Sequence, residues 1–167
     1  MRSSIGLRRT ALCGLATIAV LGAGGGSATA VKTATKQITC KLTLYATIKQ
    51  PAPTAANFGA ANCSAPLRNG VQRDASTTTR TSPLTGSFTG PFKMFFDRGS
   101  IHGTFTISFV TTVDAALHIT GVTYKGTLKV TGGSARNKRV RGTGTITGFS
   151  PDAVKTNLTE VLALTGV

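Results

Sequence analysis

The feature of this sequence that most constrains its fold is a long alternation of apolar and polar side chains. The first such run places one set of residues on a single face: Ile38, Cys40, Leu42, Leu44, Ala46 and Ile48. A β-strand points successive side chains to opposite faces, so this run predicts a long strand with one buried face. A surface helix needs apolar residues three and four positions apart, which this run does not provide.

Two further runs are separated by the turn-forming sequence Asp97-Arg98-Gly99. Both alternate with period two, and a short turn between two such runs predicts a β-hairpin. The inward parities of the two runs give the expected core: Leu84, Phe88, Phe92, Met94, Ile101, Phe105, Ile107 and Phe109.

The C-terminal part of the chain predicts more strands. The parity of the apolar residues changes between Ile119 and Val122, which indicates a β-bulge near Thr120-Gly121. Two more strands are expected from Val140 to Gly148 and from Leu158 to Leu164.

Two segments predict other structure. Ser150-Pro151-Asp152 has the composition of a helix cap, so we expect at most one short helix. Residues 54–83 contain many turn-forming residues and show little periodicity, which predicts an irregular loop region.

The predicted fold class is all-β, a single antiparallel meander. Threonine accounts for 26 of residues 31–167, and glycine recurs inside the predicted strands. Threonine suits a half-exposed pleated surface, and glycine permits a strand to coil sharply. Long, glycine-rich strands joined by short turns favour a closed or nearly closed β-barrel, with a β-sandwich as the alternative.

Residues 1–30 resemble a secretory signal peptide. Arg2, Arg8 and Arg9 precede a short apolar stretch, and Ala28-Thr29-Ala30 supplies the small residues of a cleavage site. The apolar stretch is well below the roughly 20 residues that span a bilayer, and no later segment is more apolar, so no transmembrane segment is expected. The sequence predicts a secreted protein whose single domain is residues 31–167.

The cysteines predict one disulfide. Cys13 lies in the predicted signal peptide, which leaves Cys40 and Cys63 as a pair in an oxidising compartment. A metal site would require further Cys or His residues between them, and that interval contains none. We therefore expect a disulfide and neither a metal nor another cofactor.

The charge of the chain is strongly positive. It contains 19 Lys and Arg against 5 Asp and Glu, a formal net charge of +14. Such a charge favours weak binding to a polyanionic envelope component or another extracellular partner. Aromatic residues interleaved with the basic ones are scarce, so specific nucleic-acid recognition is not expected. The candidate polyanion-binding residues are Lys125, Lys129, Arg136, Lys138, Arg139 and Arg141.

Part of the chain resembles a known type of barrel. The hairpin from Gly86 to Phe109, the run from Tyr124 to Gly133 and the segment from Val140 to Gly144 resemble dirigent and allene oxide cyclase proteins, over about half of the mature chain. This resemblance implies an eight-stranded barrel whose interior or mouth holds a small apolar molecule.

Two residues are candidate polar groups in such a ligand pocket. Glu160 shares the parity of Leu158 and Leu162, and a carboxylate inside a barrel would have a shifted pKa and could bind a ligand. The alternatives are a register shift that turns Val161 and Ala163 inward, or a pair between Glu160 and a lysine at the rim. Tyr124 is the second candidate.

No catalytic residue is indicated. His102 and His118 are both expected to be exposed, and no nucleophile is predicted beside them. The first hypothesis is therefore a secreted, basic, non-enzymatic barrel with weak polyanion affinity, and the alternative is a small-ligand barrel. An interior filled by phenylalanines would favour the first, and an open apolar pocket with a convergent polar group the second. Whether any catalysis occurs, the ligand and the oligomeric state are left open.

Overall fold

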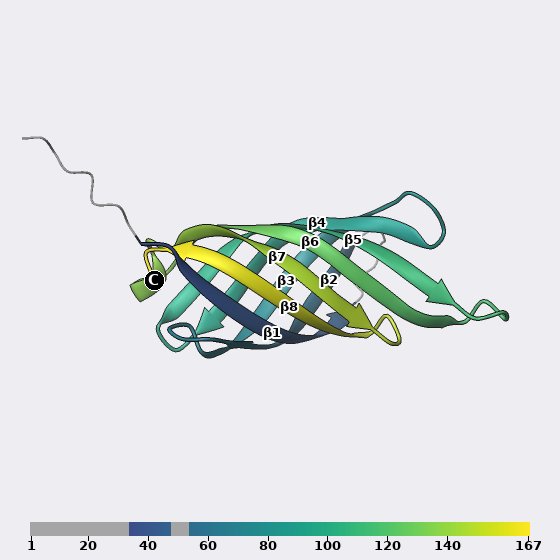
Figure 1. The fold of residues 1–167 in the computed structure, drawn as a ribbon, viewed down its shortest axis with the longest axis horizontal. Coiled ribbons are helices and arrows are strands. Elements are labelled where there is room, and N and C mark those ends of the chain that lie inside the picture. The colour runs from purple at the N-terminus through teal and green to yellow at the C-terminus, as the bar shows by residue number, and fades with distance from the viewer. Residues whose placement is uncertain (1–33, 48–53) are drawn as a thin grey trace, which may run out of the picture. The chain divides into compact units, whose positions relative to one another are not determined.

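The structure is a computed structural model that describes residues 34–47 and 54–167, and these form one closed antiparallel β-barrel (Figure 1). Eight strands follow one another in chain order, and β8 pairs with β1 to close the barrel. The predicted all-β meander is confirmed, and the sandwich alternative is wrong. The strands are β1 Lys36–Thr47, β2 Thr54–Cys63, β3 Asn69–Arg80, β4 Thr85–Phe96, β5 Gly99–Val113, β6 Ile119–Gly133, β7 Arg141–Ser150 and β8 Lys155–Thr165.

Several predictions fall on residues that the structure does not describe. These are the signal peptide at residues 1–30, with Cys13, and the end of the first predicted strand at Ile48. In the part of the chain that is described, no helix is long and apolar enough to cross a membrane.

The central hairpin has the predicted register. In the β4–β5 pair, Met94 lies opposite Ile101 and Phe88 opposite Ile107. Phe105 is buried and its neighbour Thr104 is exposed, as the alternation predicts. The predicted core is wrong at Leu84, which is 39% exposed because it lies in the turn between β3 and β4, where the chain has left the barrel wall.

The predicted irregular region at 54–83 is wrong over most of its length, since it forms β2 and β3. The inward residues of β3 are polar, namely Gln72, Asp74 and Ser76, and β2 contributes small buried residues such as Gly59 and Ala61. These strands therefore lack the apolar alternation that identifies a strand with one face in an apolar core.

The predicted helix cap at Ser150-Pro151-Asp152 is also wrong. Asp152 Oδ1 accepts hydrogen bonds from the backbone N–H groups of Val154 (2.9 Å) and Lys155 (2.8 Å), which closes a tight turn between β7 and β8. Ala153 has a φ of 59°, a left-handed conformation that cannot begin a right-handed helix. The short helical turn that the described residues contain is a 3₁₀ turn, η1, at Ala135–Asn137.

The predicted bulge in β6 is confirmed. Thr112 pairs with Gly121 and Val113 with Ile119, so Thr120 is the extra residue in the register. The bulge explains why the apolar parity changes within this strand.

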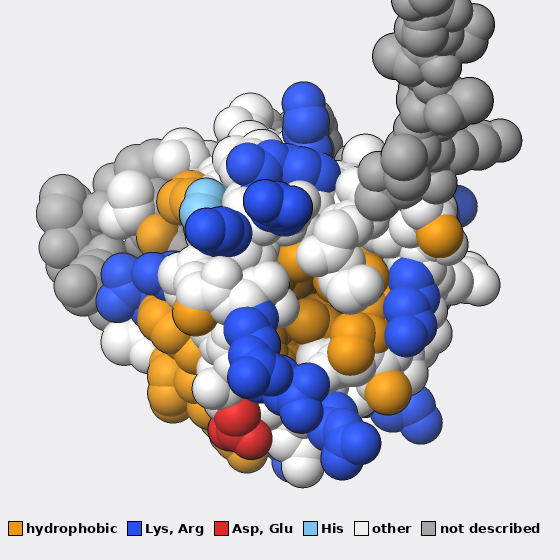
Figure 2. All heavy atoms as spheres, turned by 90° about the vertical axis from the view of Figure 1, so that its left-hand side faces the viewer, with side chains coloured by type: hydrophobic (Ala, Val, Ile, Leu, Met, Phe, Trp, Pro, Cys, Tyr) orange, Lys and Arg blue, Asp and Glu red, His pale blue; other side chains and the backbone are white. Residues whose placement is uncertain are grey.

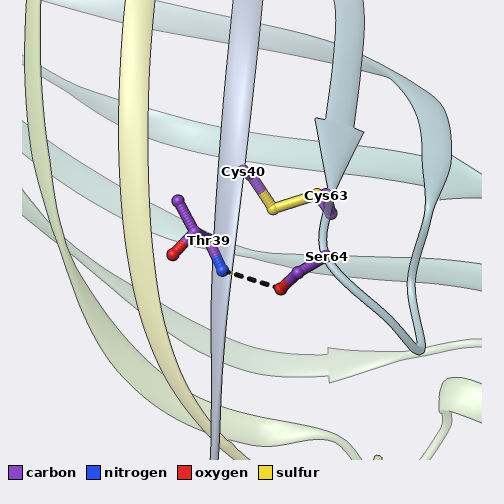
Figure 3. The surroundings of a disulfide bond; sticks show 4 residues. All are labelled: Thr39, Cys40, Cys63 and Ser64. Atoms are coloured by element: carbon purple, nitrogen blue, oxygen red, sulfur yellow. Dashed lines mark hydrogen bonds between the residues drawn. A yellow bond between two sulfur atoms is a disulfide. The ribbon is translucent and has the colours of Figure 1, made fainter.

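The predicted disulfide is confirmed and joins β1 to β2 (Figure 3). The Cys40 and Cys63 sulfur atoms are 2.01 Å apart, and the two residues are direct cross-strand partners. Beside them, the backbone N–H of Thr39 donates to Ser64 Oγ (3.1 Å), and the N–H of Ser64 donates to the Thr39 carbonyl (2.8 Å). These contacts hold the end of β2 against β1.

The two ends of the barrel are built differently. At the end nearest the C-terminus, which we call the plugged end, the β2–β3 and β6–β7 connections bring Leu67 and Val140 into the core, both buried. At the opposite end, which we call the hollow end, the turns at 81–84, 114–118 and 151–154 are exposed. The hollow end lies on the right in Figure 1.

Candidate functional site: a cavity at the hollow end

The hollow end contains a cavity of about 290 Å³ inside the barrel. This volume is near the lower limit of the pockets that bind small molecules, which run from roughly 300 to 1,000 Å³. Its walls come from β1, β2, β3, β4, β5, β6 and β8 together with the β7–β8 turn. The apolar lining residues include Leu44, Phe88, Phe105, Ile107 and Leu158, and the polar ones are Asn57, Asp74, Ser76, Arg80, Tyr124 and Thr156.

Aromatic rings form one wall of the cavity. Phe88 stacks on Phe109 with ring centroids 4.7 Å apart, and the Tyr124 ring lies 6.4 Å from that of Phe88. At the mouth, the Arg80 guanidinium lies 5.7 Å from the centroid of Phe109 and donates to the Pro83 carbonyl at 2.7 Å. Phe88 and Phe105 therefore line an open space and do not fill it.

A carboxyl group faces this cavity from β3. Asp74 Oδ1 accepts a 2.7 Å hydrogen bond from Asn57 Nδ2, and Oδ2 accepts a 3.4 Å hydrogen bond from Gln72 Nε2. Burial raises the pKa of Asp74, although the hydrogen bonds from Asn57 and Gln72 act in the opposite direction. A carboxylate offers about four lone-pair sites, so Asp74 keeps acceptor capacity for a ligand.

Glu160 is the second carboxyl group inside the barrel. It is 2% exposed and lies between Cys40 of β1 and Ile146 of β7 in the sheet register. The register-shift alternative is therefore wrong, and so is the lysine partner, because the ion pair found among the described side chains joins His118 to Asp114. Glu160 does not line the cavity itself but lies two residues beyond Leu158, further into the barrel.

The environment of Glu160 favours its protonated form. Burial, then the nearby charge of Asp74, raises its pKa to about 8, and a hydrogen bond with Gln72 opposes this rise. Glu160 Oε2 and Gln72 Oε1 are both buried and have no hydrogen-bond partner. Both atoms are acceptors, so a proton on Glu160 supplies a donor to a cluster that has an excess of acceptors.

Tyr124, the second candidate polar group, lines the cavity. Its hydroxyl is hydrogen-bonded with Thr156 and Ser150, and burial raises its pKa. These contacts hold the hydroxyl on the β6–β8 side of the cavity.

The polar wall of β3 lies in the segment that was predicted to be a loop, so it was missed as part of a site. The signal that could have revealed it is the alternation of Gln72, Asp74 and Ser76 with Val71 and Arg73. This is a strand pattern in which the inward residues are the polar ones.

The predicted basic residues lie outside the barrel and are all exposed. Arg136, Lys138, Arg139 and Arg141 follow one another through η1 to the start of β7 at the plugged end, where Lys and Arg side chains greatly outnumber acidic ones (Figure 2). The Arg141 guanidinium donates to the backbone carbonyls of Lys138 (3.1 Å) and Val140 (2.7 Å).

The two lysines of β6 differ in their relation to this cluster. Lys129 pairs with Thr143, two residues from Arg141, so it borders the cluster on the outer wall. Lys125 pairs with Thr147, four residues further along β7, and lies apart from it.

Both histidines are exposed, as expected. His118 Nδ1 lies 3.2 Å from Asp114 Oδ2 in the β5–β6 turn, and His102 faces outward on β5. Within the described ranges, no group of three or more His, Cys, Asp or Glu side chains could hold a metal ion.

Comparison with known proteins adds little. No protein-family description matches the chain, and no curated protein matches it. Among solved structures, the chain is similar to one described as pyocyanin demethylase, with 16% sequence identity, coverage of 79% of this chain and 100% of that chain, and a TM-score of 0.44. The eight-stranded barrel implied by the resemblance to dirigent and allene oxide cyclase proteins is confirmed by the strand order, whereas membership of either family is not shown.

Proposed function

We propose that this protein is a small-molecule-binding barrel whose ligand enters the cavity at the hollow end. The observation that carries this proposal is an open cavity that is lined by both aromatic rings and the Asp74 carboxyl. Binding pockets are typically apolar with a few convergent polar groups, and this cavity has that composition. The ligand would be a largely apolar molecule of two or three fused rings, in keeping with about 290 Å³.

A cavity-filling variant tests this proposal. Ala46 of β1 lines the cavity, so Ala46→Phe would occupy part of the space that a ligand needs. We expect the neutral fluorescent probe N-phenyl-1-naphthylamine to bind the wild-type protein and to lose that binding in Ala46→Phe. Ala163→Phe, on the exposed face of β8, is the matched control and should bind as the wild type does. Equal binding by both variants would place the probe outside the cavity and contradict the proposal.

A second function, weak adhesion to polyanions, is supported by the basic cluster at the plugged end. This cluster is remote from the cavity in the barrel, so the two functions do not compete for the same residues. Export of the protein, as the composition of residues 1–30 predicts, would bring this cluster into contact with an acidic envelope component. Retention on an immobilised polyphosphate column that falls steeply with salt would support this second function, because such binding depends on counter-ion release.

A further inference from the structure

The charges of this protein are divided between the outside and the inside of the barrel. None of the described Lys and Arg side chains is buried, whereas two of the 5 acidic residues, Asp74 and Glu160, are. No ion pair to either carboxyl is found among the described residues. A buried carboxylate is costly unless a cation or several hydrogen bonds compensate it, so the interior of this barrel is short of positive charge.

Arg80 does not supply that charge. It lines the mouth of the cavity, but its guanidinium donates to the Pro83 carbonyl and lies over the ring of Phe109. The contacts to Asp74 are made by neutral amides, Asn57 and Gln72. The carboxyl is thus held in place by its neighbours and left without a counter-charge.

The aromatic residues that line the cavity also suit a positive charge. The faces of aromatic rings attract cations, and Phe88 and Tyr124 present an aromatic wall to the same space that Asp74 lines. Aromatic ligands pack against aromatic side chains, so a cavity lined by both these rings and a carboxyl group favours a molecule that is both aromatic and cationic.

We propose that the ligand of this cavity is a planar aromatic cation, with its charge against the carboxyl of Asp74 and its ring against Phe88 and Tyr124. This inference rests on the proposed small-molecule-binding function and names the class of ligand. Unlike a merely apolar ligand, a cationic ligand requires the carboxyl group of Asp74 for its binding.

Binding of a cation should release a proton. The titratable and charged groups around Asp74 are Glu160 from β8, Tyr124 from β6, Arg80 at the end of β3 and Asp152 in the β7–β8 turn. The cavity-lining residues of β1, β2, β4 and β5 include no titratable side chain. Burial raises the pKa of Asp74 and, together with the nearby charge of Asp74, raises the pKa of Glu160 to about 8, so Glu160 retains a proton that a cation bound beside Asp74 would displace. Affinity should therefore increase with pH up to about 8, the pKa of Glu160.

Two probes of nearly the same shape distinguish the effect of ligand charge on binding from the effect of ligand size. The ion 1-methylquinolinium carries a permanent positive charge, and 1-methylnaphthalene is its neutral counterpart. We expect the wild-type protein to bind the cation about tenfold more tightly at pH 8 than at pH 6, while the affinity for the neutral probe does not change. The charge of the probe does not titrate, so any pH dependence comes from the protein. Calorimetry in two buffers of different ionisation enthalpy at pH 7.5 should show net proton release.

The variant Asp74→Asn tests the role of the carboxyl. It should weaken binding of 1-methylquinolinium about tenfold or more and leave 1-methylnaphthalene binding unchanged. Asp114→Asn is the matched control, because it removes the same charge from an exposed turn at the same end of the barrel. If Asp74→Asn does not fold, the pH profile of the wild-type protein and its preference for the cation over the neutral probe still test whether the buried carboxyl pair holds the cation.

The outcomes separate this inference from the function on which it rests. If neither probe binds, the small-molecule-binding function is wrong. If both bind equally well and independently of pH, the barrel binds small molecules but the cationic class is wrong. If Asp74→Asn and Asp114→Asn weaken cation binding equally, the cation is held by the general field of the protein, and the assignment to Asp74 is overturned.

Discussion

The two ends of the barrel show how one meander can combine a packed core with a cavity. At the plugged end, most of the inward residues are apolar, and the connections at Leu67 and Val140 fill the space that the strands enclose. At the hollow end, polar residues of β3 and aromatic residues of β4 and β6 surround an open volume. The two ends differ in the side chains that the same strands point into the barrel. A barrel of eight strands is just wide enough for side chains to fill, so leaving space at one end depends on that choice.

Strand β8 has inward residues in both the hollow half and the packed half of the barrel. Leu158 lines the cavity, and Leu162 is in the packed half, with Glu160 between them on the same face. Both leucines are buried, at 7% and 0% exposure. The same substitution at the two positions therefore measures the difference between the ends.

The largest expected effect is that of Leu162→Ala. Removal of a fully packed leucine leaves a cavity, and we expect a loss of about 4 kcal/mol in the free energy of unfolding. Leu158→Ala should cost about 2 kcal/mol, because one side of Leu158 already faces empty space. Urea unfolding of the two variants measures the difference, and equal losses would mean that the hollow end is packed as tightly as the plugged end.

The next effect is that of the disulfide. Cys40 and Cys63 are 23 residues apart in sequence, and the chain-entropy relation gives a stabilisation of about 3 kcal/mol for a loop of this length. We expect the double Cys→Ser variant to lose that amount in urea unfolding and still bind N-phenyl-1-naphthylamine when folded, because neither cysteine lines the cavity. A folded variant that no longer binds would show that the disulfide maintains the hollow end as well.

A smaller effect per step is the pH dependence of stability. The pKa of Glu160 is about 8 in the folded protein against an ordinary value of 4.5, so between these values the native state holds a proton that the unfolded chain has lost. Stability should therefore fall as pH rises through this range, by about 1.4 kcal/mol per pH unit, and level off above pH 8. The raised pKa of Asp74 acts in the same direction at lower pH.

Glu160→Gln is the variant that isolates this effect. Glutamine has the same shape, does not titrate and brings an N–H donor to a cluster whose acceptors lack partners. Thermal unfolding of the variant should show no such fall between pH 5 and pH 8, and the variant should be more stable than the wild type at pH 8. A wild-type profile that is flat over this range would mean that water reaches Glu160.

The smallest effect on stability is expected at the basic cluster. Arg136, Lys138, Arg139 and Arg141 are exposed, so their joint replacement by Gln should leave the circular dichroism spectrum and the unfolding curve almost unchanged. Retention on polyphosphate should nevertheless drop, which separates a binding role from a structural one. Replacing Lys125 alone, which lies apart from the cluster, is the control for removal of a basic side chain outside the cluster. Unchanged retention of the quadruple variant would place the polyanion-binding surface elsewhere.

The sequence predicted those strands that have one face in the apolar core. The β4–β5 register and the bulge at Thr120 follow from parity, and the structure has both. Parity also allowed an inward Glu160 but left a register shift and a lysine pair as alternatives, and the structure shows the inward position. β2 and β3 were missed because their inward residues are small or polar, so the usual contrast between the two faces is absent. Asp74 was missed with them, because a strand that presents polar groups to a cavity loses the pattern that identifies it as a strand.

The pairing of β8 with β1 has a consequence for how the chain reaches its native state. The barrel closes through contacts between the first and last strands of the described chain, such as Cys40 with Glu160. Contacts between residues so distant in sequence form slowly, because loop closure costs entropy before the contacts compensate it. Until β8 docks, β1 and β7 present unpaired backbone edges, which are templates for pairing with other chains. Folding of this protein should therefore compete with aggregation most strongly in its last step, and the competition should worsen with protein concentration.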